Sequence, residues 1–350
     1  MTVDFIFDGL NQLFPAVAGN DFFLIIAMLL PVAALLGFIT IYGFGVIYSE
    51  IKVSSFIQDK TGPMGQGPGL HAGKWGLLQP VADGIKLFIK EDIIPASADK
   101  PLFILAPFLI FIGALTAFIA VPFGEKIIIV DMNIGIFYII GVGSLAVIAL
   151  ILAGWSSNNK WALFGGMRSA AQIISYELTL GLAVLAVIVY SGSFSLVDIV
   201  ESQRYMWLVI PQFLGFVIFI ISAVAETNRA PFDLPEAETE IVAGYFVEYT
   251  GIRFAMFFLA EYANMFLMSM LVTVLYLGGW NGFTIPGLEA ISGIVWTLVK
   301  ALSLMFGYFW LRATLPRLRY DQLMAFCWKI LLPLGVLNLF IAAIMRLVWS

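Results

Sequence analysis

The sequence has very few of the residues that hold metals, redox cofactors or disulfides. Its 350 residues include one cysteine, Cys327, and one histidine, His71. A single cysteine excludes a disulfide within the chain and any zinc or iron–sulfur site built from its own cysteines. A single histidine excludes a haem held by two histidines. We therefore expect no metal site and no electron-transfer cofactor on this chain, so that any redox cofactor lies on a partner.

Charged residues are scarce as well. They make up 12% of the chain, against 61% hydrophobic residues and a mean hydropathy of +0.98, whereas soluble domains carry about 25% charged residues. The N-terminal MTVDFIFDGL is acidic and lacks the basic start of a cleavable signal peptide. We recognise no soluble domain, long linker or internal repeat. The composition predicts an all-α integral membrane protein with a single membrane domain over residues 1–350.

Eight apolar runs come close to the length of about 20 residues that a membrane-spanning helix needs. They lie at residues 22–48, 101–123, 132–153, 178–197, 206–225, 254–277, 291–311 and 323–345. Lys300 lies near the middle of the seventh run, too central to reach the interface easily. We therefore expect Lys300 to form an ion pair with an acid inside the helix bundle, and Glu261 is one candidate partner.

Basic residues predict the orientation of these spans. If the N-terminus lies outside, the outer segments hold only Lys126, Arg204 and Arg346, and most other basic residues fall in cytoplasmic loops. This bias places both termini on the outer, periplasmic side. The first cytoplasmic loop includes Asp83, Lys86 and Lys90 at helical spacing among apolar residues, as in an amphipathic helix at a membrane surface. An ordinary surface helix has the same pattern.

Acidic residues gather between the fifth and sixth apolar runs. The carboxylates there are Glu226, Asp233, Glu236, Glu238, Glu240, Glu248 and Glu261, and Glu177 stands at the mouth of the fourth run. Asp233 and Glu236 form a capping-box pattern. A helix that begins there would place Glu236, Glu240, Gly244 and Glu248 on one face, with Glu238 opposite. Ionised groups near hydrocarbon are costly unless they are paired, hydrated or functional. The pattern fits either a solvated loop or a line of acids that carries protons into the membrane.

Five stretches resemble one membrane subunit of NADH:quinone oxidoreductase (respiratory complex I), the one called subunit 1 in mitochondria. They are GLLQPVADGIKLFIKE, GWSSNNKWALFGGMRSAAQIISYE, AETNRAPFDLPEAETEIVAGYFVEY, FFLAEYANM and RATLPRLRYDQLM, in that order. The first loop departs from the family pattern. The family usually has Arg where this chain has Ile51, Arg where it has Lys60 and Asn where it has Met64. Lysine keeps the charge of arginine but lacks its bidentate fork.

The resemblance implies a membrane-arm subunit of a proton-translocating NADH:quinone oxidoreductase, in the inner membrane of a bacterium. Its partners would be the hydrophilic quinone-site and iron–sulfur subunits, the small membrane subunits and lipid, with quinone as substrate and no nucleic acid. The quinone chamber would be lined or shaped by Asp83, Arg229, Asp233 and Lys60. The proton path would use Glu177, Glu226, Glu240, Glu248 and Glu261, with Glu236 and Glu238 in a moving loop.

Two other functions remain open at this point. Related subunits anchor membrane-bound hydrogenases or F420-type dehydrogenases, which use no NADH. A free-standing ion-coupled transporter with an acid inside the membrane is a different class. Such a transporter would usually show internal repeats or interrupted spans, and neither is visible in this sequence.

Overall fold

The computed structural model describes residues 21–63, 75–125, 127–234, 241–282 and 289–349. Within these ranges the regular elements are helical, and the only β-type pairing is an isolated bridge between Gly124 and Ile127. The α-helices are α2 (Asp21–Ile57), α3 (Gln79–Ile89), α4 (Lys100–Ala117), α5 (Gly135–Gly143), α6 (Leu145–Ser156), α7 (Lys160–Ser191), α8 (Leu196–Ser202), α9 (Phe213–Glu226), α11 (Gly251–Tyr276), α12 (Glu289–Thr314), α13 (Tyr320–Phe326) and α14 (Leu332–Trp349). Two 3-10 helices, η2 (Phe118–Ala120) and η3 (Gly244–Phe246), and a π-helix, η4 (Cys327–Leu331), complete the set. The prediction of an all-α protein is confirmed for the part of the chain that is described.

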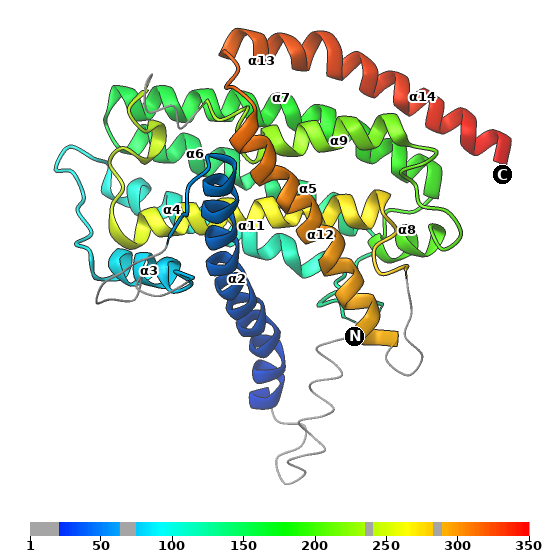
Figure 1. Ribbon diagram of the computed structural model, residues 1–350, viewed down its shortest axis with the longest axis horizontal. Helices are drawn as coiled ribbons and strands as arrows, with labels where there is room; N and C mark the ends of the chain where they lie inside the picture. Colours follow the sequence, from blue (N-terminus) through cyan, green and yellow to red (C-terminus); the bar gives the residue numbers. More distant parts are fainter. Residues whose placement is uncertain (1–20, 64–74, 126, 235–240, 283–288, 350) are drawn as a thin grey trace.

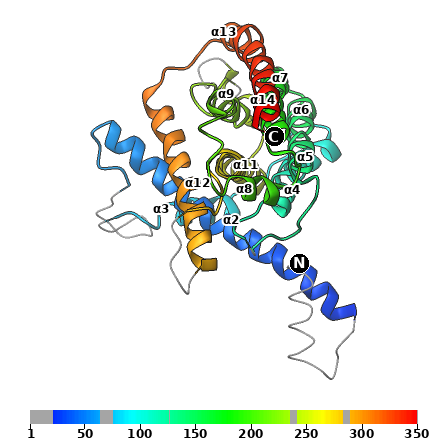
Figure 2. The same cartoon turned by 90° about the vertical axis from the view of Figure 1, so that its right-hand side faces the viewer.

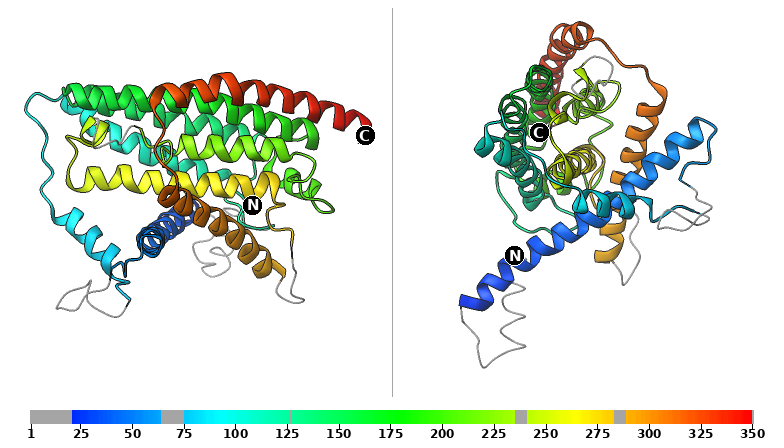
Figure 3. Two further views of the ribbon diagram at one scale, coloured as in Figure 1. Left: turned by 45° about the horizontal axis from the view of Figure 1, so that its top comes forward. Right: turned by 90° about the vertical axis from the view of Figure 1, so that its left-hand side faces the viewer.

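Helix α11 forms the centre of the bundle. Its side chains are buried almost all the way round from Ala260 to Tyr276, as expected for a helix that is apolar on every face. Near its middle, the ring of Phe266 packs against those of Tyr42 and Phe118, with centroids 4.5 and 5.9 Å away. Figures 1 and 3 show α7, α9 and α11 running side by side, while α2 and α12 cross them steeply. Figure 2 shows α2 and α12 together on one flank of the bundle.

Seven helices in the described ranges are long and apolar enough to cross a membrane. They lie at Leu29–Ile57, Lys100–Ala120, Gly135–Ser156, Lys160–Ser191, Gly251–Tyr276, Ile291–Thr314 and Tyr320–Val348. The fifth predicted run corresponds to the shorter helix α9, with 14 residues. Its helix begins at Phe213 instead of residue 206, directly after a turn that contains Pro211. Proline lacks a backbone N–H and disfavours helical backbone in the residue before it, which explains the later start.

Helix α7 begins much earlier than the apolar run predicts. The fourth run starts at residue 178, but the helix starts at Lys160, where the side chain of Asn159 accepts a hydrogen bond from the backbone N–H of Trp161. The expected loop is therefore largely helical, and the predicted start was wrong. Hydropathy detects only the apolar part of a helix, whereas an asparagine N-cap and a segment rich in small residues extend it through polar sequence.

The acidic segment does not continue as one helix to Glu248. Glu236, Glu238 and Glu240 lie outside the described residues. After them, Val242 has a positive φ of 66° and a short 3-10 helix, η3, follows. A left-handed residue ends a right-handed helix, so the prediction that Gly244 and Glu248 continue the helical stripe of Glu240 was wrong. The capping-box pattern depends only on Asp233 and Glu236, so it could not predict the turn at Val242.

Candidate functional site

A buried guanidinium lies between two carboxylates where three parts of the chain meet. Arg229 follows the end of α9, and its Nη1 lies 3.3 Å from Oε1 of Glu50 on α2. Its Nε lies 2.6 Å from Oε1 of Glu261 on α11. The exposed fractions are 5% for Glu50, 6% for Arg229 and 9% for Glu261. One buried cation between two buried acids is a charged cluster within the bundle, and it carries the candidate site.

Two further side chains complete this cluster. The hydroxyl of Tyr262 donates a 2.6 Å hydrogen bond to Oε2 of Glu50, and its ring centroid lies 4.5 Å from the guanidinium of Arg229. Arg312, near the end of α12, forms an ion pair with Oε1 of Glu50. Its side chain is 43% exposed, so the cluster extends from the interior toward the surface. Sequence reasoning did not select Glu50, Tyr262 or Arg312. Glu50 ends a charge-free run of about 28 residues, and that position was the available signal.

The loop that carries Arg229 is tied to the segment after α12. Oδ2 of Asp233 accepts a 2.9 Å hydrogen bond from Arg317, and the backbone N–H of Leu318 donates to the carbonyl of Pro231 at 3.2 Å. The basic stretch RATLPRLRYDQ therefore supplies Arg312 to the buried cluster and Arg317 to Asp233.

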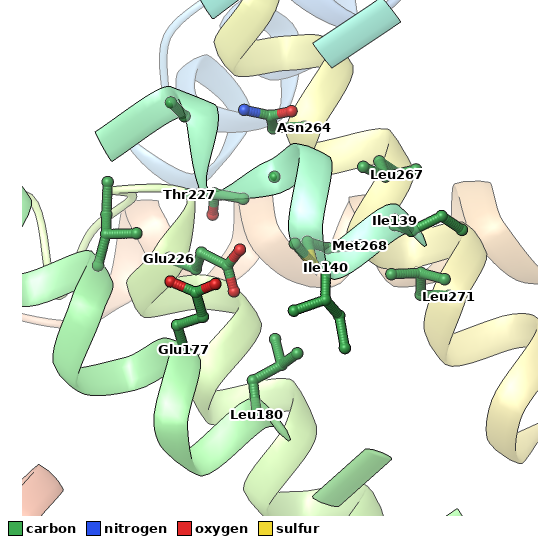
Figure 4. Close-up of a pocket in the computed structure, with 13 residues that line it drawn as sticks. Ile139, Ile140, Glu177, Leu180, Glu226, Thr227, Asn264, Leu267, Met268 and Leu271 are labelled. Carbon is green, nitrogen blue, oxygen red and sulfur yellow. The ribbon is translucent and has the colours of Figure 1, made fainter. Parts of the chain in front are cut away.

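A second pair of acids faces a small cavity. Figure 4 shows the carboxylates of Glu177, from α7, and Glu226, from α9, turned toward one another. The cavity holds about 30 Å³ and is otherwise mostly apolar, with Thr227 and Asn264 as its other polar residues. A space of that size has room for one or two water molecules. Asn264 lies three residues after Glu261 on α11, within one turn, so the cavity adjoins the Arg229 cluster.

The other predicted residues make separate contacts. Asp83 pairs with Lys86 on the same helix at 3.2 Å, and the ammonium of Lys60 donates to Gln58 at 3.0 Å. Glu248 accepts a 2.7 Å hydrogen bond from the side chain of Asn159, at the start of α7. None of these contacts joins the Arg229 cluster. The structure thus brings together Arg229 and Glu261 in one place, and Glu177 and Glu226 in another.

Tyr249, the residue after Glu248, is buried. Its ring stacks on that of Phe103 with centroids 4.1 Å apart, and its hydroxyl donates to the Phe103 carbonyl at 3.3 Å. Burial raises the pKa of Tyr249 to about 12. Its hydroxyl therefore stays protonated at neutral pH.

Lys300 does not pair with Glu261. Its ammonium donates to the carbonyls of Leu277, Gly279 and Asn281, whereas Glu261 is bound to Arg229. The predicted pairing was wrong. The ammonium of Lys300, on α12, lies beside the C-terminal end of α11. Glu261 lies about 24 Å from that end along α11, at 1.5 Å per residue. The spacing of residues within each helix could not predict this separation.

Comparison with known proteins decides the family. The family model described as NADH dehydrogenase matches residues 29–343. The chain belongs to the NADH dehydrogenase family. It is 50% identical over 326 residues to a subunit of the NADH-quinone oxidoreductase of Brevibacillus brevis, covering 93% of this chain and 94% of that protein. It is 48% identical over 318 residues to NADH-ubiquinone oxidoreductase chain 1 of Chondrus crispus, covering 91% and 94%. The resemblance recognised from the five motifs is confirmed.

Within this member of the NADH dehydrogenase family, both acid sites include residues of the motifs that carry the resemblance. AETNRAPFDLPEAETE supplies Glu226, Arg229 and Asp233, and FFLAEY supplies Glu261 and Tyr262. The described residues include no group of three or more His, Cys, Asp or Glu side chains placed to hold a metal ion.

Proposed function

We propose that this chain is a membrane-arm subunit of a proton-translocating NADH:quinone oxidoreductase, and that it couples quinone reduction to proton movement. The observation that carries the proposal is the buried bridge from Glu50 through Arg229 to Glu261. Burying one arginine between two acids has a high desolvation cost. The names of the relatives supply the reaction, since both quoted relatives are quinone oxidoreductase subunits.

The reduction of a quinone to a quinol takes up two electrons and two protons. We expect the electrons to arrive from iron–sulfur centres on partner subunits. Arg229, Asp233, Arg312 and Arg317 would shape the wall of the quinone chamber beside the buried cluster, with Asp83 and Lys60 nearer its mouth. Arg312 is the partly exposed member of the cluster, which suits a wall that faces an incoming substrate.

The bridge supports a coupling step. Negative charge on a reduced quinone headgroup would compete with the carboxylates for the guanidinium of Arg229. Glu261, whose ionic contact is with Arg229, would then favour its protonated form, because a buried carboxylate without a cation is costly. Asn264 and water in the adjoining cavity would connect Glu261 with Glu226 and Glu177. Glu248, Glu236, Glu238 and Glu240 are proposed members of this path on the family resemblance.

The proposal includes an arrangement of the chain in the membrane and a set of partner subunits. The seven apolar helices and α9 would make eight spans, with both termini on the periplasmic side of a bacterial inner membrane. Hydrophilic quinone-site subunits, iron–sulfur subunits and small membrane subunits would be the partners. A role in anchoring a hydrogenase or an F420-type dehydrogenase is the second candidate, but the quoted relatives favour the quinone enzyme. No observation favours a free-standing transporter.

Glu261→Gln in the assembled complex tests the function. Glutamine keeps the shape of the side chain but cannot carry the charge, so NADH–quinone turnover and proton translocation in proteoliposomes should lose most of their rate. Electron transfer from NADH to a soluble acceptor should persist, because it precedes the quinone step. Asp198→Asn is the matched control, since Asp198 is exposed and accepts a hydrogen bond from Ser193 at 2.7 Å. Normal quinone turnover in Glu261→Gln, or equal loss with both acceptors, would overturn the proposal.

A further inference from the structure

Lys300 uses all its hydrogen-bonding capacity on backbone carbonyls. Its side chain lies in α12, and its Nζ donates to the carbonyls of Leu277, Gly279 and Asn281 at 2.6, 2.8 and 2.9 Å. An ammonium has three N–H donors, so the set is complete. Lys300 is only 8% exposed. The three carbonyls therefore surround the charge in the way that they would surround a free cation.

The turn that provides these carbonyls is shaped for close approach. It follows the end of α11, where helix carbonyls lack intrahelical partners and the helix dipole is negative. Gly278 and Gly279 have φ angles of +72° and +49°. A Cβ at Gly278 would lie 2.8 Å from a ring carbon of Trp207, and a Cβ at Gly279 would lie 2.8 Å from a methyl carbon of Val200. Only glycine fits both the backbone conformation and the space.

Aromatic rings complete the surroundings of the ammonium. The Nζ of Lys300 lies 4.5 Å from the ring centroid of Trp207 and 5.5 Å from that of Trp296. Ring faces attract ammonium groups. Among the described residues no carboxylate pairs with Lys300. Carbonyls and rings alone suit a single positive charge, whereas divalent cations usually recruit carboxylates. The chemistry of the site therefore selects a monovalent, ammonium-like cation.

We propose that the turn Leu277–Asn281 is a monovalent-cation site that the ammonium of Lys300 fills as a tethered occupant. The filled site holds the end of α11 against α12 and Trp207. The opposite end of α11 is held by an ion pair of 3.0 Å between Arg253 and Asp92. Lys300 is thus a positioning residue, because it fixes the axial position of the helix that carries Glu261 without touching that carboxylate.

Lys300→Met in the assembled, detergent-solubilised complex tests the site. Methionine keeps an apolar stem but removes the charge and the three donors, so the thermal unfolding midpoint of the complex should fall. Ammonium chloride should raise the midpoint of this variant toward the wild-type value, since ammonium fits the empty site. Tetramethylammonium chloride at the same ionic strength should not, because it is larger and has no N–H donor. Neutral ammonia, in equilibrium with ammonium, can reach a buried position.

Turnover and two further variants complete the test. We expect NADH–quinone turnover in Lys300→Met to be about threefold lower, the size of effect expected when coupling is perturbed from a distance, and to recover with ammonium. Lys300→Arg keeps the charge but not the tripod of donors, so its midpoint should lie between those of wild type and Lys300→Met. Lys329→Met, which removes an exposed lysine in the next span, should not respond to ammonium.

Three results would overturn the proposal: a wild-type midpoint in Lys300→Met, an equal effect of the two salts, or the same ammonium response in Lys329→Met. The midpoint reports on the cation site whatever reaction the complex catalyses. A failure of the proposed quinone function would leave the midpoint results unchanged, so the two failures are distinguishable.

Discussion

The pairing between Arg229 and Glu261 can be measured with a double-mutant cycle. Arg229→Met leaves Glu50 with Arg312 and Tyr262 as partners but removes the cation that contacts Glu261 at 2.6 Å. Breaking a buried ion pair from one side typically costs about 3–5 kcal/mol. Glu261→Gln keeps the guanidinium bound to Glu50 and removes only the charge of the carboxylate in the ion pair with Arg229, so it should cost less than Arg229→Met, which leaves an uncompensated acid in the interior.

The double variant should cost less than the two single variants together. Once Glu261 is neutral, the loss of Arg229 no longer leaves an uncompensated acid in the interior. We expect the cycle to give an interaction free energy of about 2 kcal/mol, within the range for directly contacting residues. Thermal unfolding of the assembled complex, compared among the four proteins under one protocol, measures the four stabilities. Additive effects of the two substitutions would refute the bridge between Arg229 and Glu261.

Three other outcomes follow from the structure and the proposed orientation. In a Cys327→Ala background, a cysteine introduced at Lys160 should react with an impermeant thiol reagent only from the cytoplasmic side and one at Arg204 only from the outer side; labelling of both from one side would defeat the eight-span topology. Asp83→Asn should slow quinone reduction while NADH oxidation by a soluble acceptor continues, and equal loss of both activities in an assembled complex would argue against a place at the quinone chamber. Glu226→Gln removes one of the two facing carboxylates in the small cavity, so it should assemble normally and lower proton translocation together with quinone turnover; unchanged translocation would show that this cavity is not on the proton path.

Local pattern was enough to predict that the described elements are helical and where seven of the long apolar helices lie. Apolar runs of membrane length report the transfer of side chains out of water, and that free energy depends on composition more than on contacts. The sequence predicted the starts of the helices less well. Asn159 and Pro211 each moved a helix start away from the edge of its apolar run, because capping and proline chemistry act on single backbone groups that hydropathy does not describe.

The sequence pattern identified only some of the residues of the candidate site. Glu177, Glu226 and Glu261 were identified by their positions in or beside apolar runs. An ionised group near hydrocarbon is costly in any fold unless it is paired, hydrated or functional. Their partners came from distant segments. Glu50 and Arg312 are separated by most of the chain, yet both belong to the Arg229 cluster.

The sequence alone therefore determined that this is an all-helical membrane protein of the NADH dehydrogenase family with acids at its membrane segments. Composition, run length and motif order carry that information locally. Only the tertiary structure decided that Arg229, and not Lys300, is the partner of Glu261, and that Lys300 caps the far end of the same helix. The physical reason is that charge pairing falls off with distance in space, and the packing of α2, α11 and α12 sets those distances.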